Sequence, residues 1–242
     1  MKAMVFCAGY GSRLGDLTRE TPKPMLDLCG RPMLEWILAH LRTQGFDEVV
    51  VNLHFKPEII RGHFGDGSRL GMRLRYTEEP QLLGTAGGVR NAASLLRGDE
   101  PFLVQYGDVV TDQDFGALMH FHRERSALVT LLVHQRAKSN SIVMIAEDGR
   151  VTSFLERPDE VSRRAADSPW VNSGICVCAP EVLNLLPEGV ADLPRDVFPK
   201  LVASGRLFAM PLSGFRCAVD SPERLALVRS ALAEKRCNIT GR

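Results

Sequence analysis

An apolar segment, residues 4–7, runs directly into a glycine-rich loop that contains Gly9 and Gly11. The apolar residues predict a first β-strand, and the small residues after it allow backbone N–H groups to face an anion. We therefore expect a phosphate-binding loop at the end of a buried strand. Leu14 stands where the dinucleotide-binding fingerprint needs a third glycine, and no Gly-Lys-Ser/Thr follows as in a P-loop, so neither of those motifs fits.

Two cationic residues follow this loop. Arg13 comes two residues after Gly11, and Lys23 lies between Pro22 and Pro24. Each proline fixes its own φ angle and restricts the residue before it, so the backbone around the lysine is stiff. A solvated arginine or a surface lysine would explain either residue alone, but the combination favours a phosphate site.

Strand-like and helix-like segments alternate along the chain. The sequence predicts helices at residues 33–44, 57–64 and 87–96, and strands at residues 48–53, 72–76, 102–106 and 127–134. Residues 141–146 and 150–156 flank Gly149 as a hairpin, and Ser221 caps a last helix that runs toward Lys235. This order predicts an α/β fold with a doubly wound, mostly parallel mixed sheet in a three-layer α/β/α arrangement.

Composition narrows the classes of function. The 242 residues include 30 basic and 29 acidic ones, which leaves no basic footprint for a nucleic acid polymer. The six scattered cysteines form no Cys-x-x-Cys pair, so we expect buried thiols. No apolar run approaches the roughly 20 residues of a membrane span, and the first strand begins at once, without a signal peptide. We expect a cytoplasmic protein that binds no membrane.

The glycine loop, Arg13-Leu14 and Pro22-Lys23-Pro24-Met25 together resemble the signature of the sugar-1-phosphate nucleotidyltransferases, or NDP-sugar pyrophosphorylases. Six further landmarks follow in order: residues 83–88 (Leu-Gly-Thr-Ala-Gly-Gly), 107–108, 156, 172–174, 196–199 and 221–223. The resemblance implies a Rossmann-like nucleotidyltransferase core in the short, core-only form. It would be a single domain over residues 1–242, with a sugar-binding antiparallel portion within about residues 135–220. The chain looks most similar to the mannose and heptose 1-phosphate guanylyltransferases.

The resemblance also implies site residues for the nucleotide. In this family a sugar phosphate oxygen attacks the α-phosphorus of a nucleoside triphosphate and expels pyrophosphate. The catalytic residues would be Arg13 on the leaving phosphates, Lys23 on the α-phosphate and Asp108 on Mg²⁺. The nucleotide would contact Ala8, Gly9, Tyr10, Gly11, Ser12, Arg13, Gln81, Gly84 and Thr85.

Asp108 is also a metal candidate by its position. It follows the predicted strand 102–106, and ligands of open α/β sheets bind beyond the carboxyl ends of the strands. Magnesium is commonly held by one or two carboxylates together with substrate phosphates. The structural alternative is an aspartate that caps the next turn.

The sequence departs from the family in several places. Ala218 stands where relatives have a second metal-binding aspartate, and Asp220 is displaced by two residues. On a strand that shift keeps the same face, so Asp220 is either the second metal ligand or a turn residue before the Ser221 cap. The family's Tyr-Gly is replaced by Asn140-Ser141, which puts the usual glycine contact to the sugar in doubt.

The expected sugar-phosphate ligands lie further along the chain. Relatives have Glu-Lys-Pro where this chain has Glu156-Arg157-Pro158, and an arginine fork can hold phosphate at two points. Asn172 and Gly174 match the Asn-x-Gly that lines the sugar pocket in relatives. The sugar-phosphate site would therefore comprise Glu156, Arg157, Asn172 and Gly174.

These residues predict a magnesium-dependent enzyme that joins a nucleoside triphosphate, most simply GTP, to heptose 1-phosphate or mannose 1-phosphate. One alternative is uridylyl or thymidylyl transfer to another sugar 1-phosphate, such as N-acetylmuramate 1-phosphate. Another is a catalytically silent paralogue that binds NDP-sugar as a regulator. The sequence does not choose the base, the sugar, the pathway or an effector, and it leaves homo-oligomerisation open.

Overall fold

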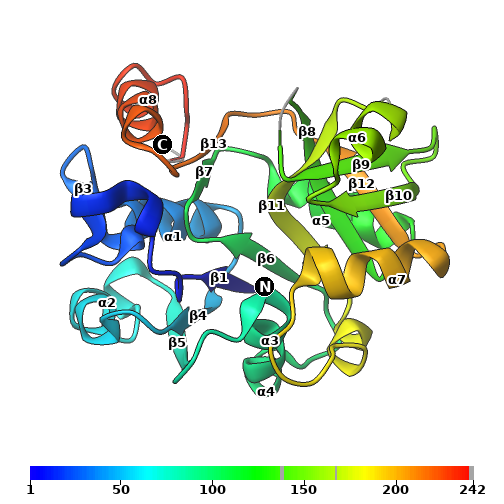
Figure 1. Ribbon diagram of the computed structural model, residues 1–242. Helices are drawn as coiled ribbons and strands as arrows, with labels where there is room; N and C mark the ends of the chain where they lie inside the picture. The colour runs from blue at the N-terminus through cyan, green and yellow to red at the C-terminus, as the bar shows by residue number, and fades with distance from the viewer. Residues whose placement is uncertain (137–138, 167, 240–242) are drawn as a thin grey trace. The chain divides into compact units, whose positions relative to one another are not determined.

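The computed structural model describes residues 1–136, 139–166 and 168–239. Seven strands form its main sheet in the order β12-β8-β11-β6-β1-β4-β5 (Figure 1). Their bounds are β1 Lys2–Phe6, β4 Glu48–Leu53, β5 Arg73–Glu78, β6 Phe102–Tyr106, β8 Val129–Gln135, β11 Trp170–Cys178 and β12 Leu207–Pro211. β1, β4 and β5 pair in parallel, as do β8 and β12, whereas β11 is antiparallel to β8. The predicted mostly parallel mixed sheet is confirmed.

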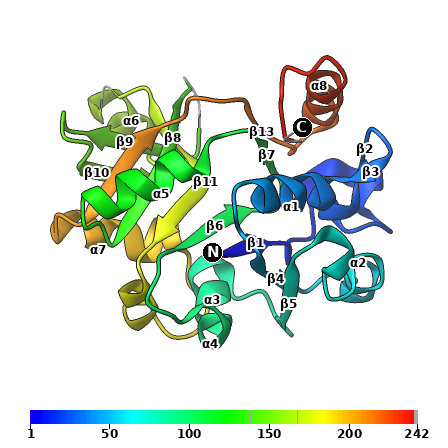
Figure 2. The same ribbon diagram turned by 180° about the vertical axis from the view of Figure 1, so that it is seen from behind.

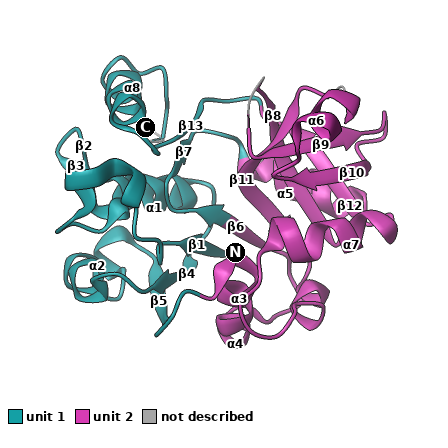
Figure 3. Ribbon diagram, in the orientation of Figure 1, with its two compact units in different colours: residues 1–82, 105–114, 213–242 teal, residues 83–104, 115–212 magenta. Residues whose placement is uncertain are grey.

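Backbone contacts divide the chain into two compact units (Figure 3). Unit 1 comprises Met1–Leu82, Gln105–Asp114 and Ser213–Arg242, and unit 2 comprises Leu83–Val104 and Phe115–Leu212.

All six cysteines are free thiols, and every one except Cys29 is buried, as their apolar settings predict. Among the described residues, no helix has the length and apolar character needed to cross a bilayer.

Unit 1 is built around parallel strands with fully buried side chains. Val49, Val50 and Val51 of β4 have no exposed surface, which explains the unbroken β-branched run in the sequence. The unit also contains α1 Met33–Thr43, α2 Pro57–Phe64, α8 Pro222–Ala233, the 3₁₀ turns η1 Ser12–Thr18, η2 Lys23–Met25 and η3 Ser68–Leu70, the paired β2 Asp27–Leu28 and β3 Arg31–Pro32, and the antiparallel β7 Val109–Thr111 and β13 Arg216–Ala218. Ser221 caps α8 as predicted, because its hydroxyl accepts a hydrogen bond from the Arg224 N–H.

Unit 2 packs layers on both faces of its strands. Helix α5 Phe115–Glu124 covers β8, β11 and β12 on one face (Figure 2). The other face carries α7 Phe198–Ala203 and the antiparallel hairpin of β9 Ser141–Ile145 and β10 Val151–Glu156 (Figure 1). The remaining elements are α3 Gly84–Asn91, α4 Ala93–Leu96, α6 Glu160–Ala166, η4 Pro180–Asn184 and η5 Leu193–Val197.

The helix predicted at residues 87–96 starts three residues earlier and is divided into α3 and α4 at Ala92. Its first N–H groups find partners in a distant segment, since Thr85 N–H donates to Asp192 Oδ1 and Ala86 N–H donates to the Ala191 carbonyl. These groups would otherwise lack hydrogen-bond partners at a helix start. Tertiary contacts therefore extend the helix beyond its apolar pattern.

Candidate active site

The glycine loop follows β1 as predicted and turns sharply at Gly11. Gly11 has a φ of +70°, and a Cβ at this position would lie 2.9 Å from the Lys23 Cβ. Only glycine satisfies both conditions, so this residue lets the loop pack against the lysine segment. Gly107 allows the end of β6 to pack closely against Phe6, because a Cβ at position 107 would lie 2.4 Å from the Phe6 carbonyl oxygen.

Gly9 differs from these two glycines. Its φ angle is not in the left-handed region, and among the described residues nothing lies within 4 Å of where its Cβ would be. Neither backbone strain nor packing requires glycine at this position. The space beside the Gly9 backbone is open, as a loop that receives a ligand through its N–H groups would need.

The structure brings Lys23 and Asp108 together. Lys23 begins η2 and is only 8% exposed, and Asp108 lies between β6 and β7. Lys23 Nζ donates to Asp108 Oδ2 at 2.5 Å. The two groups neutralise each other in a partly desolvated setting, where a lone charge would be costly. The Asp108 carboxylate is thus paired with the lysine that the sequence singled out.

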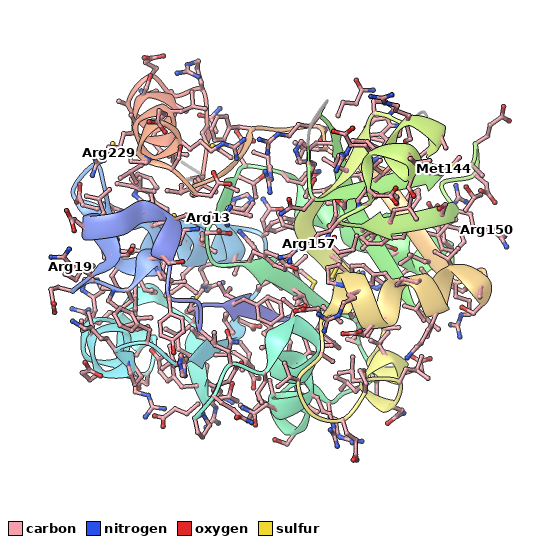
Figure 4. All side chains as sticks on the ribbon, in the orientation of Figure 1. Arg13, Arg19, Met144, Arg150, Arg157 and Arg229 are labelled. Carbon is pink, nitrogen blue, oxygen red and sulfur yellow. The ribbon has the colours of Figure 1, made fainter. Side chains whose placement is uncertain are left out.

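A second ion pair connects Arg13 to the other candidate metal ligand. Arg13 Nη1 lies 3.2 Å from Asp220 Oδ2, and Arg224 Nε lies 3.4 Å from Asp220 Oδ1. Arg13 is the exposed partner, with 67% of its side chain accessible, and it extends from the segment after the glycine loop (Figure 4). Asp220 is therefore held between two guanidinium groups. Arg224 had no role in the sequence analysis.

Asp108 and Asp220 lie near the same end of a small ladder. Ala218 of β13 pairs with Val109 of β7, and the Val219 N–H donates to the Asp108 carbonyl at 2.8 Å. Asp108 thus precedes the paired residue Val109 by one position, and Asp220 follows the paired residue Ala218 by two.

Asp108 and Asp220 are the residues that would hold a magnesium ion, if substrate phosphates complete its set of oxygen ligands. Among the described residues, no cluster of three or more His, Cys, Asp or Glu side chains could hold a metal. Magnesium needs only one or two carboxylates when phosphates supply the remaining oxygens. Because each carboxylate is now paired with a cationic side chain, metal binding requires those cations to move toward other anions, and substrate phosphates would provide them.

A hydrogen-bonded chain that the sequence analysis did not identify supports the glycine loop. The Cys7 N–H donates to Asn52 Oδ1, and Asn52 Nδ2 donates to Glu79 Oε1 at 2.6 Å. His54 Nδ1 lies 2.6 Å from the Glu79 carbonyl and Nε2 lies 2.7 Å from the Tyr10 hydroxyl. A carbonyl only accepts, so His54 Nδ1 carries a proton and donates it to the Glu79 carbonyl.

The network also involves the segment before Gly84. Glu79 is 3% exposed, and its carboxylate accepts a hydrogen bond from the Asn52 side chain. Gln81 is exposed. The sequence did hold a sign of this network, because Asn52 is a polar residue that directly follows three valines in the strand ending at Leu53.

Gly84 and Thr85 belong to unit 2, where they pack against residues 191–193. Gly84 has a φ of +72°, and a Cβ there would lie 2.5 Å from the Ala191 carbonyl oxygen. Thr85 Oγ1 accepts from the Leu193 N–H at 2.8 Å and donates to Asp192 Oδ1 at 3.3 Å. Their residue types are thus explained by packing against residues 191–193, and contact with a nucleobase stays a prediction.

The predicted sugar-phosphate residues also lie in unit 2. Glu156 ends β10, and Arg157 follows it with a φ of +49° and an 82% exposed side chain (Figure 4). Burial raises the pKa of the Glu156 carboxyl, the Arg157 charge acts in the opposite direction, and Asp192 adds to the rise. A non-glycine residue with positive φ stores strain and is worth attention in a candidate site.

Asn172 and Gly174 lie at an irregularity in the pairing of β11 with β8. Gly174 has a φ of +78°, and its N–H donates to Asn172 Oδ1 at 3.1 Å. The Asn172 N–H donates to Ser141 Oγ at 3.0 Å. The Asn-x-Gly motif therefore shapes a bulge, which is a common way to aim a side chain.

Comparison with known proteins identifies the family of this chain. Residues 2–215 match the sequence profile of the family described as nucleotidyl transferase. A Mycobacterium tuberculosis mannose-1-phosphate guanylyltransferase is 35% identical over 206 residues, or 84% of this chain and 56% of its own length. A UTP–glucose-1-phosphate uridylyltransferase from Synechocystis is 34% identical over 223 residues, or 86% of this chain and 57% of its own length. The chain thus spans a little over half the length of these relatives.

A solved structure shares the fold. HddC from Yersinia pseudotuberculosis superposes with a TM-score of 0.80 at 20% identity, covering 96% of this chain and 99% of that one. At this identity the likeness describes the fold alone. It agrees with the mixed, mostly parallel sheet of the present structure.

Proposed function

Because the chain belongs to the nucleotidyl transferase family, we propose that it transfers a nucleotidyl group from a nucleoside triphosphate to a sugar 1-phosphate and releases pyrophosphate. The observation that carries the proposal is the Lys23–Asp108 pair beside the glycine loop, with the Arg13–Asp220 pair in the same unit. This set offers both cations for phosphates and carboxylates for a metal. The presence of Arg13, Lys23 and Asp108 argues against a catalytically silent binding protein.

The reaction needs no protein nucleophile. An oxygen of the sugar phosphate forms a bond to the α-phosphorus, the bond from that phosphorus to the bridging β-oxygen breaks, and the electron pair leaves with pyrophosphate. Catalysis then depends on positioning the reactants in line and on neutralising charge. Asp108 and Asp220 are the carboxylates that would hold magnesium, and the bound ion would supply positive charge to neutralise the phosphates.

Each cationic side chain has a distinct task in this proposal. The ammonium of Lys23, held in a stiff segment between two prolines, would stabilise the charge that develops on the α-phosphoryl group. The exposed guanidinium of Arg13 would bind the departing pyrophosphate, and the open backbone beside Gly9 would receive the triphosphate through its N–H groups.

For the substrates, we propose GTP with mannose 1-phosphate or a heptose 1-phosphate. The relative named for guanylyl transfer to mannose 1-phosphate supports this choice. The relative named for uridylyl transfer to glucose 1-phosphate supports a second candidate, UTP with another sugar 1-phosphate. In either case the unit 2 residues Glu156 and Asn172 would bind sugar hydroxyls, and Arg157 would bind the sugar phosphate.

The experiment measures pyrophosphate release by the full chain with GTP, UTP, dTTP and CTP, each against mannose, glucose, heptose and N-acetylmuramate 1-phosphates. Parallel reactions contain either magnesium or EDTA. We expect magnesium-dependent release with GTP and a mannose or heptose phosphate. Release with a UTP pair instead would identify the second candidate. Nucleotide binding without release in any pair would contradict the proposed activity and favour a regulatory NDP-sugar-binding protein.

A further inference from the structure

A polar pocket of about 390 Å³ in unit 2 has no role in the proposed reaction. It lies among the end of β8, helix α6 and strands β9 and β11. Helix α6 packs against β9 (Figure 1). Three arginines line it: Arg136, Arg163 and Arg164. None of them belongs to the residues that the sequence assigned to nucleotide, sugar phosphate or metal.

The pocket has an uncompensated positive charge among the described residues. Its lining residues include no carboxylate. Arg164 lies near a carboxylate outside the lining, since its guanidinium is 3.9 Å from Glu160. Both side chains are more than 80% exposed, so this ion pair is weak.

The donors in the pocket suit a phosphate group. Arg163 Nη2 donates to the Ser139 carbonyl at 2.9 Å, which orients its guanidinium and leaves other N–H groups for a ligand. Ser141, which lines the same pocket, is 3% exposed, and its hydroxyl accepts from the Asn172 N–H. That hydroxyl still has its own hydrogen to donate. Three like charges that line one pocket repel each other, and an anion between them removes that cost.

We propose that this pocket binds the phosphate group of a small phosphorylated ligand. Arginine is the side chain best suited to phosphate, because its planar fork presents two parallel N–H donors. The volume is within the range of sites for small molecules, so it accommodates more than the phosphate alone. The same chemistry is found in free phosphate, in sugar phosphates and in nucleotides, and the experiment distinguishes these sources.

The test uses a tryptophan as a local reporter. The chain has two tryptophans, Trp36 and Trp170, and Trp36→Phe leaves only the second. The backbone N–H of Trp170 donates to Ser168 Oγ, and Ser168 lines the pocket. Fluorescence of the full-length Trp36→Phe protein is titrated at low salt with inorganic phosphate, pyrophosphate, mannose 1-phosphate and GMP. Circular dichroism first establishes that the protein is folded.

We expect a saturable fluorescence change with at least one of these ligands. Replacement of the three arginines together, R136Q/R163Q/R164Q, should weaken the apparent affinity by at least tenfold, since each loses a charge-assisted contact. The matched control R123Q/R125Q/R150Q removes three arginines of the same unit that do not line the pocket, and it should bind within twofold of the parent. If the triple pocket variant does not fold, Arg163→Lys keeps the charge, loses the fork and should still weaken binding measurably.

Several results would overturn the proposal. These are no saturable change with any ligand, equal affinity in the pocket and control variants, or a change that Lys23→Gln abolishes while the pocket variant retains it. The last result would assign the ligand to the glycine loop. A response to phosphate and pyrophosphate alone would identify a free-anion site, whereas tighter binding of mannose 1-phosphate or GMP would identify the organic ligand. None of these readouts depends on catalytic turnover, so the pocket can be tested even if the proposed function is wrong.

Discussion

Lys23 Nζ lies 2.5 Å from Asp108 Oδ2, although 85 positions separate the two residues in the sequence. Their side chains are 11% and 23% exposed, so water screens the pair only in part. The carboxylate that is proposed to hold magnesium is thus already matched with a cation. Loss of either partner leaves the other as an uncompensated, partly buried charge.

Lys23→Met should lower the melting temperature in EDTA, by an amount equivalent to about 1–3 kcal/mol, because Asp108 loses its cation. Magnesium should restore part of this loss, since the freed carboxylate gains another cation. Thermal unfolding of the variant and the parent, each with EDTA or magnesium, measures both effects. A magnesium-induced shift no larger in the variant than in the parent would argue against Asp108 as a metal ligand.

Gly9→Ala should leave the fold intact and reduce nucleotidyl transfer. Its Cβ meets no protein atom among the described residues, so the added methyl group would fall where the triphosphate is proposed to lie. Gly62→Ala in α2 is the matched control, because Gly62 likewise has no neighbour within 4 Å and no left-handed φ. We expect KM for the nucleotide to rise only in Gly9→Ala, with melting temperatures unchanged or raised in both variants. Equal kinetics in the two variants would exclude the loop from nucleotide binding.

Substitutions at the adjacent residues Asp220 and Ser221 should affect different properties of the protein. Ser221→Ala removes the N-cap of α8 and should cost about 1 kcal/mol of stability with little change in turnover. Asp220→Asn should raise the magnesium concentration needed for half-maximal activity, on the order of tenfold or more, if Asp220 binds the metal. An unchanged magnesium dependence with a raised KM for the nucleotide would instead identify Asp220 as a positioning residue for Arg13.

His122 should make the fold sensitive to acid. Burial lowers the pKa of this imidazole from its ordinary 6.5 to about 4, and Arg123 adds to the decrease. The unfolded chain takes up a proton below pH 6.5 that the folded chain refuses until about pH 4, so stability is complete above pH 6.5 and falls between these values. The full effect would be about 3 kcal/mol. Urea unfolding across this range should show a smaller slope with pH in His122→Gln, and parallel slopes would contradict the assignment.

The sequence predicted the elements whose cause is local. The β4 run of valines, the Pro57 start of α2 and the Ser221 cap all depend on neighbours within a few residues, and the structure has each of them. The early start of α3 could not be predicted, because Asp192 and Ala191 provide its N-terminal partners from about 100 residues away.

The sequence likewise predicted individual residues of the candidate site, but not the contacts between them. The motifs identified Lys23 and Asp108, but their direct pairing depends on the packing of η2 near the end of β6, which no local pattern encodes. The contact of Tyr10 with His54 was missed for the same reason. At Gly84 a sequence motif alone cannot separate binding from packing. The close approach of Gly84 to Ala191 explains the glycine without any ligand.

The most direct test of the central claim is single-turnover pyrophosphate release by Asp108→Asn, with saturating magnesium and the best substrate pair. Asp16→Asn, an exposed aspartate of the same unit, is the control. The proposed role of Asp108 predicts a loss of at least about 10²-fold in the rate for Asp108→Asn, and none for the control. A folded Asp108→Asn protein that releases pyrophosphate at the parental rate would contradict it.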